Sequence, residues 1–185
     1  MGIKPYQEMD RLLSVFSLEY GCLSIMAKGV KKITSQRGFH LDILNMVKME
    51  LEETGISGNS KFYLREIEIT NSLKNAKMDP NSFAACCVIA SFLKRTLPER
   101  SPQKTIFGIT QKTLESLDRG KEPSGVLLQY FLKTMRIMGY LPKTLPKEKL
   151  RTTLWETLTQ LDPEFTLTTR RTLGIFSRLD IKRSN

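Results

Sequence analysis

Hydrophobic and polar residues alternate through much of the first seventy positions, with the period of two that is typical of half-buried strands. The clearest case lies in residues 43–53, where Val47, Met49 and Leu51 alternate with Lys48, Glu50 and Glu52. The same reasoning predicts strands over 10–17, 22–29 and 61–69, with Gly21 in a tight connection and "TGISGNS" (54–60) as a hairpin loop. We therefore expect a small β-barrel or a meander, not a parallel sheet.

After residue 78 the hydrophobic period becomes helical. Asp79-Pro80 and Asp162-Pro163 each place a capping Asp before a Pro that suits the first helical turn. In 124–142, Leu127, Phe131, Met135 and Met138 share one face that Leu128 and Leu132 widen, and a stripe this broad is usually buried. Gly139 suits the C-cap and Pro142 prevents continuation. We expect helices near 80–97, 104–118, 125–138, 146–160 and 163–178.

The two patterns together predict an α+β protein with its domain boundary in "NSLKNAKMDP" (71–80). Residues 1–72 would form a small β-sheet domain, and oligonucleotide-binding (OB) folds are one class of small barrel, while residues 73–185 would form an α-helical domain. The longest apolar run, around 83–93, is shorter than the roughly 20 residues of a membrane span, and no signal peptide pattern opens the chain. We expect a cytoplasmic protein without a membrane partner.

The net charge of +10 points to a polyanionic partner, although a merely basic protein remains an alternative. Residues 1–70 hold 9 of the 29 basic and 9 of the 19 acidic residues, so the remainder, with 20 and 10, carries the whole excess.

One acid-free segment concentrates cations between two predicted strands. "MAKGVKKITSQRG" (26–38) contains Lys28, Lys31, Lys32 and Arg37, and no Asp or Glu occurs between Glu19 and Asp42. A loop at the rim of a small barrel is where OB-folds bind nucleic acid, so we expect these four residues to contact phosphates. A solvated turn is the alternative for Lys31 and Lys32.

Base stacking would need aromatic side chains beside these cations. The candidates near the loop or on the last predicted strand are Phe16, Tyr20, Phe39, Phe62 and Tyr63. Which of them face the groove stays open, and core positions are favoured for Phe16 and Phe62.

Two further basic clusters lie in the helical part. One consists of Lys143, Lys147, Lys149 and Arg151, and the other of Arg170, Arg171, Arg178, Lys182 and Arg183. Arg170 and Arg171 are weaker candidates for DNA contacts, because basic residues at helix ends also complement the helix dipole.

Residues suited to catalysis are sparse. His40 is the only histidine, and Glu50, Glu52, Glu53, Glu66 and Glu68 fit the solvated face of strands. Cys22, Cys86 and Cys87 form no CxxC and are interpreted as small core residues. No phosphate-binding loop motif occurs. We therefore expect no catalytic centre, no cofactor and no metal.

Two stretches resemble the bacterial recombination mediator family RecO. "YQEMDRLLSVFSLEYGCLSIMAKGVKKITSQRG" (6–38) is similar to that family's amino-terminal motif, and "LLQYFLKTMRIMGYLP" (127–142) to its helix ending in a GYLP-like turn. The resemblance implies an OB-fold followed by helices and a non-enzymatic role in recombinational DNA repair. It also implies binding of single- and double-stranded DNA, strand annealing and help in recombinase loading. The implied partners are RecR and the acidic C-terminal tail of single-strand DNA-binding protein.

This chain departs from the family pattern in three places. Only "MGIKP" precedes Tyr6, where family members carry a further strand, so we expect a barrel with its first strand missing or a misassigned start. No four-cysteine zinc module follows the GYLP turn. Thr34 and Gln36 stand where family loops often carry cations, which predicts weaker DNA affinity through the loop.

Competing interpretations remain at this point. An RNA-binding OB-fold protein would use the same cationic groove, and a helical protein-interaction adaptor would lack DNA binding altogether. A nuclease is a third alternative, which would depend on the carboxylates.

Overall fold

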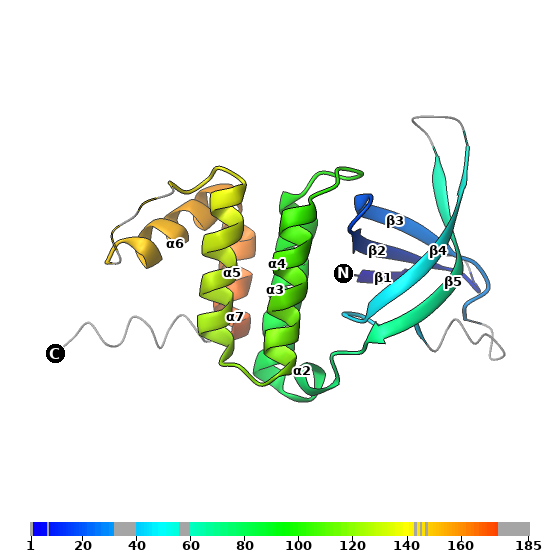
Figure 1. Ribbon diagram of the computed structural model, residues 1–185, viewed down its shortest axis with the longest axis horizontal. Coiled ribbons are helices and arrows are strands. Elements are labelled where there is room, and N and C mark those ends of the chain that lie inside the picture. The colour runs from blue at the N-terminus through cyan, green and yellow to red at the C-terminus, as the bar shows by residue number, and fades with distance from the viewer. Residues whose placement is uncertain are drawn as a thin grey trace. The chain divides into compact units, whose positions relative to one another are not determined.

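The computed structural model describes residues 2–6, 8–31, 40–55, 60–142, 144, 146 and 148–173, and the side chains of helical residues up to 169. The chain forms two compact units, which are taken separately below (Figure 1). The first contains the described residues up to Lys74 together with Leu93–Lys104. The second contains Asn75–Phe92 and the described residues from Thr105 onward.

The first unit is built on a five-stranded sheet with the strand order β1-β2-β3-β5-β4. Its strands are β1 (Gly2–Pro5), β2 (Arg11–Ser17), β3 (Gly21–Ala27), β4 (Met46–Thr54) and β5 (Lys61–Asn71). All neighbours are antiparallel except β3 and β5, which are parallel at Ile25–Phe62 and Met26–Tyr63. Each of the four predicted strands is present within a few residues of its expected bounds.

Two expectations about this sheet need correction. The first strand is not missing, because Gly2–Pro5 pairs with β2 along its whole length. A four-residue strand shows too little alternation to be recognised from its sequence. The sheet is also not a closed barrel, since no pairing among the described residues joins the outer strands β1 and β4. The α+β class is confirmed, and the sheet corresponds to a partly open OB-type arrangement.

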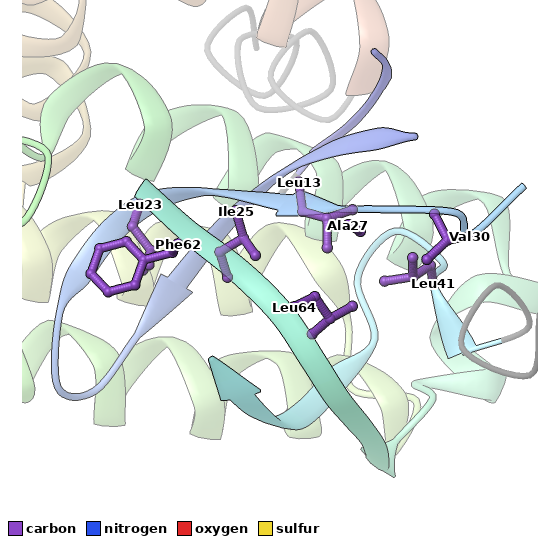
Figure 2. Close-up of a cluster of buried hydrophobic side chains, with 8 residues drawn as sticks. All are labelled: Leu13, Leu23, Ile25, Ala27, Val30, Leu41, Phe62 and Leu64. Atoms are coloured by element: carbon purple, nitrogen blue, oxygen red, sulfur yellow. The ribbon is translucent and has the colours of Figure 1, made fainter. Parts of the chain in front are cut away.

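One face of this sheet forms the core of the first unit. The buried residues are Leu13, Leu23, Ile25, Ala27, Val30, Leu41, Phe62 and Leu64. Figure 2 shows Phe62 close to Leu23 at one end of this cluster and Val30 beside Leu41 at the other. Because successive side chains of a strand point to opposite faces, the core residues also define which residues lie on the outer face.

A segment beyond the sheet completes the first unit. The backbones of Glu99 and Cys22, at the start of β3, form an isolated parallel β-bridge. The Arg100 amide donates to the Cys22 carbonyl at 2.8 Å. The Arg100 guanidinium donates to Ser60 and lies 5.3 Å from the Phe62 ring centroid. Residues far along the chain thus return to the sheet.

The helices are α2 (Lys74–Met78), α3 (Pro80–Thr96), α4 (Lys104–Asp118), α5 (Pro123–Ile137), α6 (Leu150–Leu161) and α7 (Pro163–Leu173). Asp79 and Asp162 cap α3 and α7 as expected, accepting from the amides of Ser82 and Phe165 at 2.8 Å. The helix expected near 146 begins only at Leu150, and its N-cap Lys149 makes no side-chain capping bond. Residues 174–178 of the last expected helix lie outside the described residues.

An aromatic cluster forms the core of the second unit. Phe92, Tyr130, Phe131 and Phe165 pack with ring centroids 5.1–6.4 Å apart. Leu127, Phe131 and Met135 are fully buried, which confirms the broad stripe predicted for 125–138. Gly139 has a φ of 82°, as its expected C-cap position requires. In the described part of the chain, no helix is long and apolar enough to span a membrane.

Candidate nucleic-acid interface

Lys28 and Lys31 lie where β3 leaves the sheet. Lys28 is exposed, and its Nζ lies 4.4 Å from the centroid of the Tyr63 ring. Lys31 is partly exposed, and its backbone N–H donates to the Met9 carbonyl at 3.1 Å. Both cations therefore stand at one end of the sheet.

The β1–β2 loop fixes the backbone around these two lysines. Asp10 Oδ1 accepts from the Gly29 amide at 2.8 Å, and Gly29 has a φ of 67°, a conformation that glycine adopts readily. Val30 points into the core and is 3% exposed. The turn that carries Lys28 and Lys31 is thus held by one buried side chain and by two hydrogen bonds that its amides donate to the β1–β2 loop.

The other predicted contact residues are not placed by the structure. Lys32, Arg37 and Phe39 lie outside the described residues. Arg170 and Arg171 belong to α7 by their backbone, and their side chains are not described. Their roles therefore stay predictions.

The described aromatic residues separate onto different surfaces. Phe62 is 4% exposed and belongs to the core, as favoured from the sequence. Phe16 differs from that expectation: its neighbour Val15 packs against the core, so Phe16 lies on the opposite face and is partly exposed. Tyr20 stands in the β2–β3 hairpin, at the far end of β3 from Lys28, with its ring 5.2 Å from Phe62.

Tyr63, one of the five aromatic candidates from the sequence, is the one that lies beside Lys28. It lies on the outer face, opposite to Phe62, and pairs with Met26 of β3. Met26 in turn pairs with Leu12 of β2, and all three side chains are partly exposed. The only sequence signal was the alternation of Phe62 and Tyr63, which shows that their faces differ but not which of them is buried.

Acidic residues occupy the outer face of β4 and β5. Glu50 stands directly opposite Glu66, and Lys48 opposite Glu68, with all four exposed. Glu52 forms an ion pair with Arg65. The predicted solvated face is confirmed for these four glutamates, whereas Glu53 is exposed but pairs with Phe62 on the core face. The outer face of the sheet is therefore cationic near Lys28 and anionic along β4 and β5.

The described residues offer little to nucleophilic or metal chemistry. No group of three or more His, Cys, Asp or Glu suited to a metal occurs among them. Burial raises the pKa of Cys22 to about 11 and that of Cys86 to about 12, so both thiols are protonated near neutral pH. What the described surface does offer is two cations, Lys28 and Lys31, beside the partly exposed ring of Tyr63.

Two family models match most of the chain. The model described as "Recombination protein O N terminal" matches residues 1–73, and "Recombination protein O C terminal" matches residues 78–144. Three similar curated proteins, all named DNA repair protein RecO, come from Caldanaerobacter subterraneus, Dehalococcoides mccartyi and Listeria monocytogenes. They are 25%, 28% and 23% identical over 73%, 85% and 74% of this chain.

The chain spans only part of these relatives, covering 53%, 60% and 52% of their respective lengths. Their names refer to DNA repair and mention no catalytic activity.

Proposed function

Since the chain belongs to the RecO family of DNA repair and recombination proteins, we propose that it is a non-enzymatic, DNA-binding recombination mediator. In this role it binds single- and double-stranded DNA, anneals complementary strands and assists recombinase loading. Its partners in that work are RecR and the acidic C-terminal tail of single-strand DNA-binding protein. The cytoplasm, where the bacterial chromosome lies, is its place of action.

The position of Lys28 and Lys31 carries the DNA-binding part of this proposal. Both extend from the end of a strand in an OB-type sheet, and Lys32 and Arg37 follow in the same acid-free segment. Cations at such a rim neutralise phosphates and release condensed counterions. These contacts position a strand without reading its sequence.

Overall charge supports the two classes of partner. The chain carries a net charge of +10, which complements both a DNA backbone and an acidic protein tail. Arg170 and Arg171 are further candidates for such contacts. The acidic tail would bind in a hydrophobic pocket near α5.

The test is a salt titration of DNA binding by fluorescence anisotropy. Labelled single-stranded DNA is titrated with the natural chain and with the double variant Lys28→Gln/Lys31→Gln. Losing two phosphate contacts should reduce the magnitude of the slope of log affinity against log salt concentration by about 1.4 on single strands. The matched control is Lys112→Gln/Lys133→Gln, which removes the same charge from exposed positions on α4 and α5.

The outcomes separate the alternatives. A smaller salt slope in the Lys28→Gln/Lys31→Gln variant alone supports the proposed phosphate contacts. Equal slopes in this variant and in the control would mean that the phosphate contacts lie on another surface. If the natural chain binds no DNA at low salt, the adaptor without DNA binding is favoured. An RNA strand of the same sequence is titrated in parallel, and tighter binding of RNA would favour the RNA-binding alternative.

A further inference from the structure

We propose that Tyr63 is a base-stacking platform that gives this protein a preference for single-stranded over duplex DNA. The inference rests on the proposed function, because it assigns a second kind of contact to the same surface. Lys28 and Lys31 account for phosphate binding, which single strands and duplexes share. Tyr63 accounts for a contact that only an unpaired base can make.

Strand pairing places Tyr63 on the outer face between two neighbouring strands. Tyr63 pairs with Met26 of β3 on one side and with Glu52 of β4 on the other, so these two strands flank it. Phe62 and Leu64, the residues before and after it, are both buried in the core and fix the direction of the Tyr63 side chain. The ring is thereby held by the sheet and needs little ordering when a base stacks on it.

Lys28 connects the ring with the phosphate-binding segment. Its Nζ lies 4.4 Å from the ring centroid, the distance of a cation–π contact. At an exposed position such a contact is weak, so a base can take its place over the ring. The displaced ammonium then lies beside the nucleotide whose base is stacked, where it can pair with the phosphate.

On the side of β1 to β3, the surroundings of Tyr63 combine apolar side chains with cations, as a single nucleic-acid strand requires. Leu12 and Met26 continue the partly exposed apolar row across β2 and β3, and Lys4 pairs with Leu12 at its far end. Tyr6 and Met9, 46% and 47% exposed, stand on the loop that is attached to Gly29 and Lys31. Apolar and aromatic contacts flanked by cations are what single-strand binding surfaces combine.

The decisive experiment compares single-stranded and duplex DNA for the natural chain and for Tyr63→Leu. Removing one base–aromatic stack should weaken single-strand binding by about 5- to 150-fold. Duplex affinity should stay unchanged, because paired bases do not offer their faces. The salt slope on single strands should also stay unchanged, since stacking releases no counterions, and this separates the effect from that of the lysine variants.

Two controls distinguish stacking from a general loss of structure. Tyr63→Trp keeps an aromatic face and should retain single-strand affinity, while urea denaturation of both Tyr63 variants tests the fold. Tyr20→Leu removes a more exposed tyrosine at the opposite end of β3 and should bind DNA as the natural chain does.

Each result decides the matter. A selective loss of single-strand affinity that Trp restores supports the platform. Unchanged binding by Tyr63→Leu, or an equal loss on both forms of DNA, overturns it while leaving the proposed function in place. A natural chain that binds neither form overturns the proposed function and this inference together.

Discussion

At Gly21 the requirement for glycine depends on a contact made in the tertiary structure. It begins β3 with a φ of 71°, and a Cβ added there would overlap the backbone carbonyl of Ser101. Gly120 has a similar φ of 77° but no atom within 4 Å of an added Cβ. At either position a non-glycine residue would be strained by the positive φ. At Gly21 its Cβ would also clash with the backbone of Ser101.

The pair therefore separates backbone strain from steric exclusion. We expect Gly120→Ala to lower the free energy of unfolding by about 1 kcal/mol. Gly21→Ala should lower it by about 2 kcal/mol or more, because the Ser101 backbone must also move. Urea denaturation followed by circular dichroism measures both, and equal losses would mean that Ser101 does not approach β3 in solution.

Residue-level reasoning also shows where the site was predictable. Lys28 and Lys31 were predicted as contact residues because cations without nearby acids stand out in any sequence, and that role stays a prediction. Tyr63 was one of five aromatic candidates, and the sequence could not select it, because its exposure depends on which face of β5 packs against Leu23 and Ile25. That choice is made by pairing between segments about forty residues apart.

At the scale of single elements, local signals were sufficient. Asp79 and Asp162 marked the starts of α3 and α7 because capping uses only residues within one helical turn. The elements that escaped prediction are β1 and α2, of four and five residues, which are too short for a periodic pattern. The start of α6 at Leu150 was missed because its N-cap, Lys149, makes no side-chain capping bond that could mark it in the sequence.

The Asp79 cap predicts a particular dependence of stability on pH. Hydrogen bonds from Ser82 hold the pKa of Asp79 below its usual value, so the folded state favours the carboxylate. The resulting stabilisation is present above the pKa of the unfolded chain and is lost as pH falls through the lower folded-state pKa. Thermal denaturation between pH 2.5 and 6 should show this decline.

Asp79→Asn is the matched control, because an Asn side chain still caps the helix but does not titrate over this range. Its melting temperature should fall less than that of the natural chain as the pH is lowered. Identical pH profiles would show that the cap contributes nothing through its charge.

On the scale of the whole molecule, charge is segregated more sharply than the totals indicate. The first seventy residues hold equal numbers of basic and acidic residues, yet the outer face of the sheet separates them. Glu50 and Glu66 face each other across β4 and β5, an arrangement that costs stability. Acidic residues on this side also oppose an approaching phosphate backbone.

Neutralising these two carboxylates should therefore have two effects. Glu50→Gln/Glu66→Gln should raise the free energy of unfolding by about 0.2–1 kcal/mol through the loss of like-charge repulsion. It should also raise DNA affinity by about 2- to 4-fold at low salt, an effect that fades as screening increases. Urea denaturation measures the effect on stability and fluorescence anisotropy the effect on DNA binding. Lower DNA affinity of the variant would contradict the second expectation, because it would mean that these carboxylates support DNA binding and do not oppose it.

The division of the chain into domains 1–72 and 73–185 stays a prediction. Leu93–Lys104 belongs to the first compact unit although it follows much of α3. Nothing in the sequence of this segment indicates its return to β3, because the bridge between Cys22 and Glu99 joins residues far apart in the chain.

The sequence by itself determined the longer strands and helices, the caps of α3 and α7, the buried stripe of α5 and the cationic segment that leaves β3. These features depend on alternation, helical periodicity, capping and charge, which act between residues a few positions apart. Only the tertiary structure decided that β3 and β5 pair in parallel, that Tyr63 lies beneath Lys28 and that Ser101 closes against Gly21. Those contacts depend on which distant segments bury their apolar faces together, and many pairings satisfy the same local pattern.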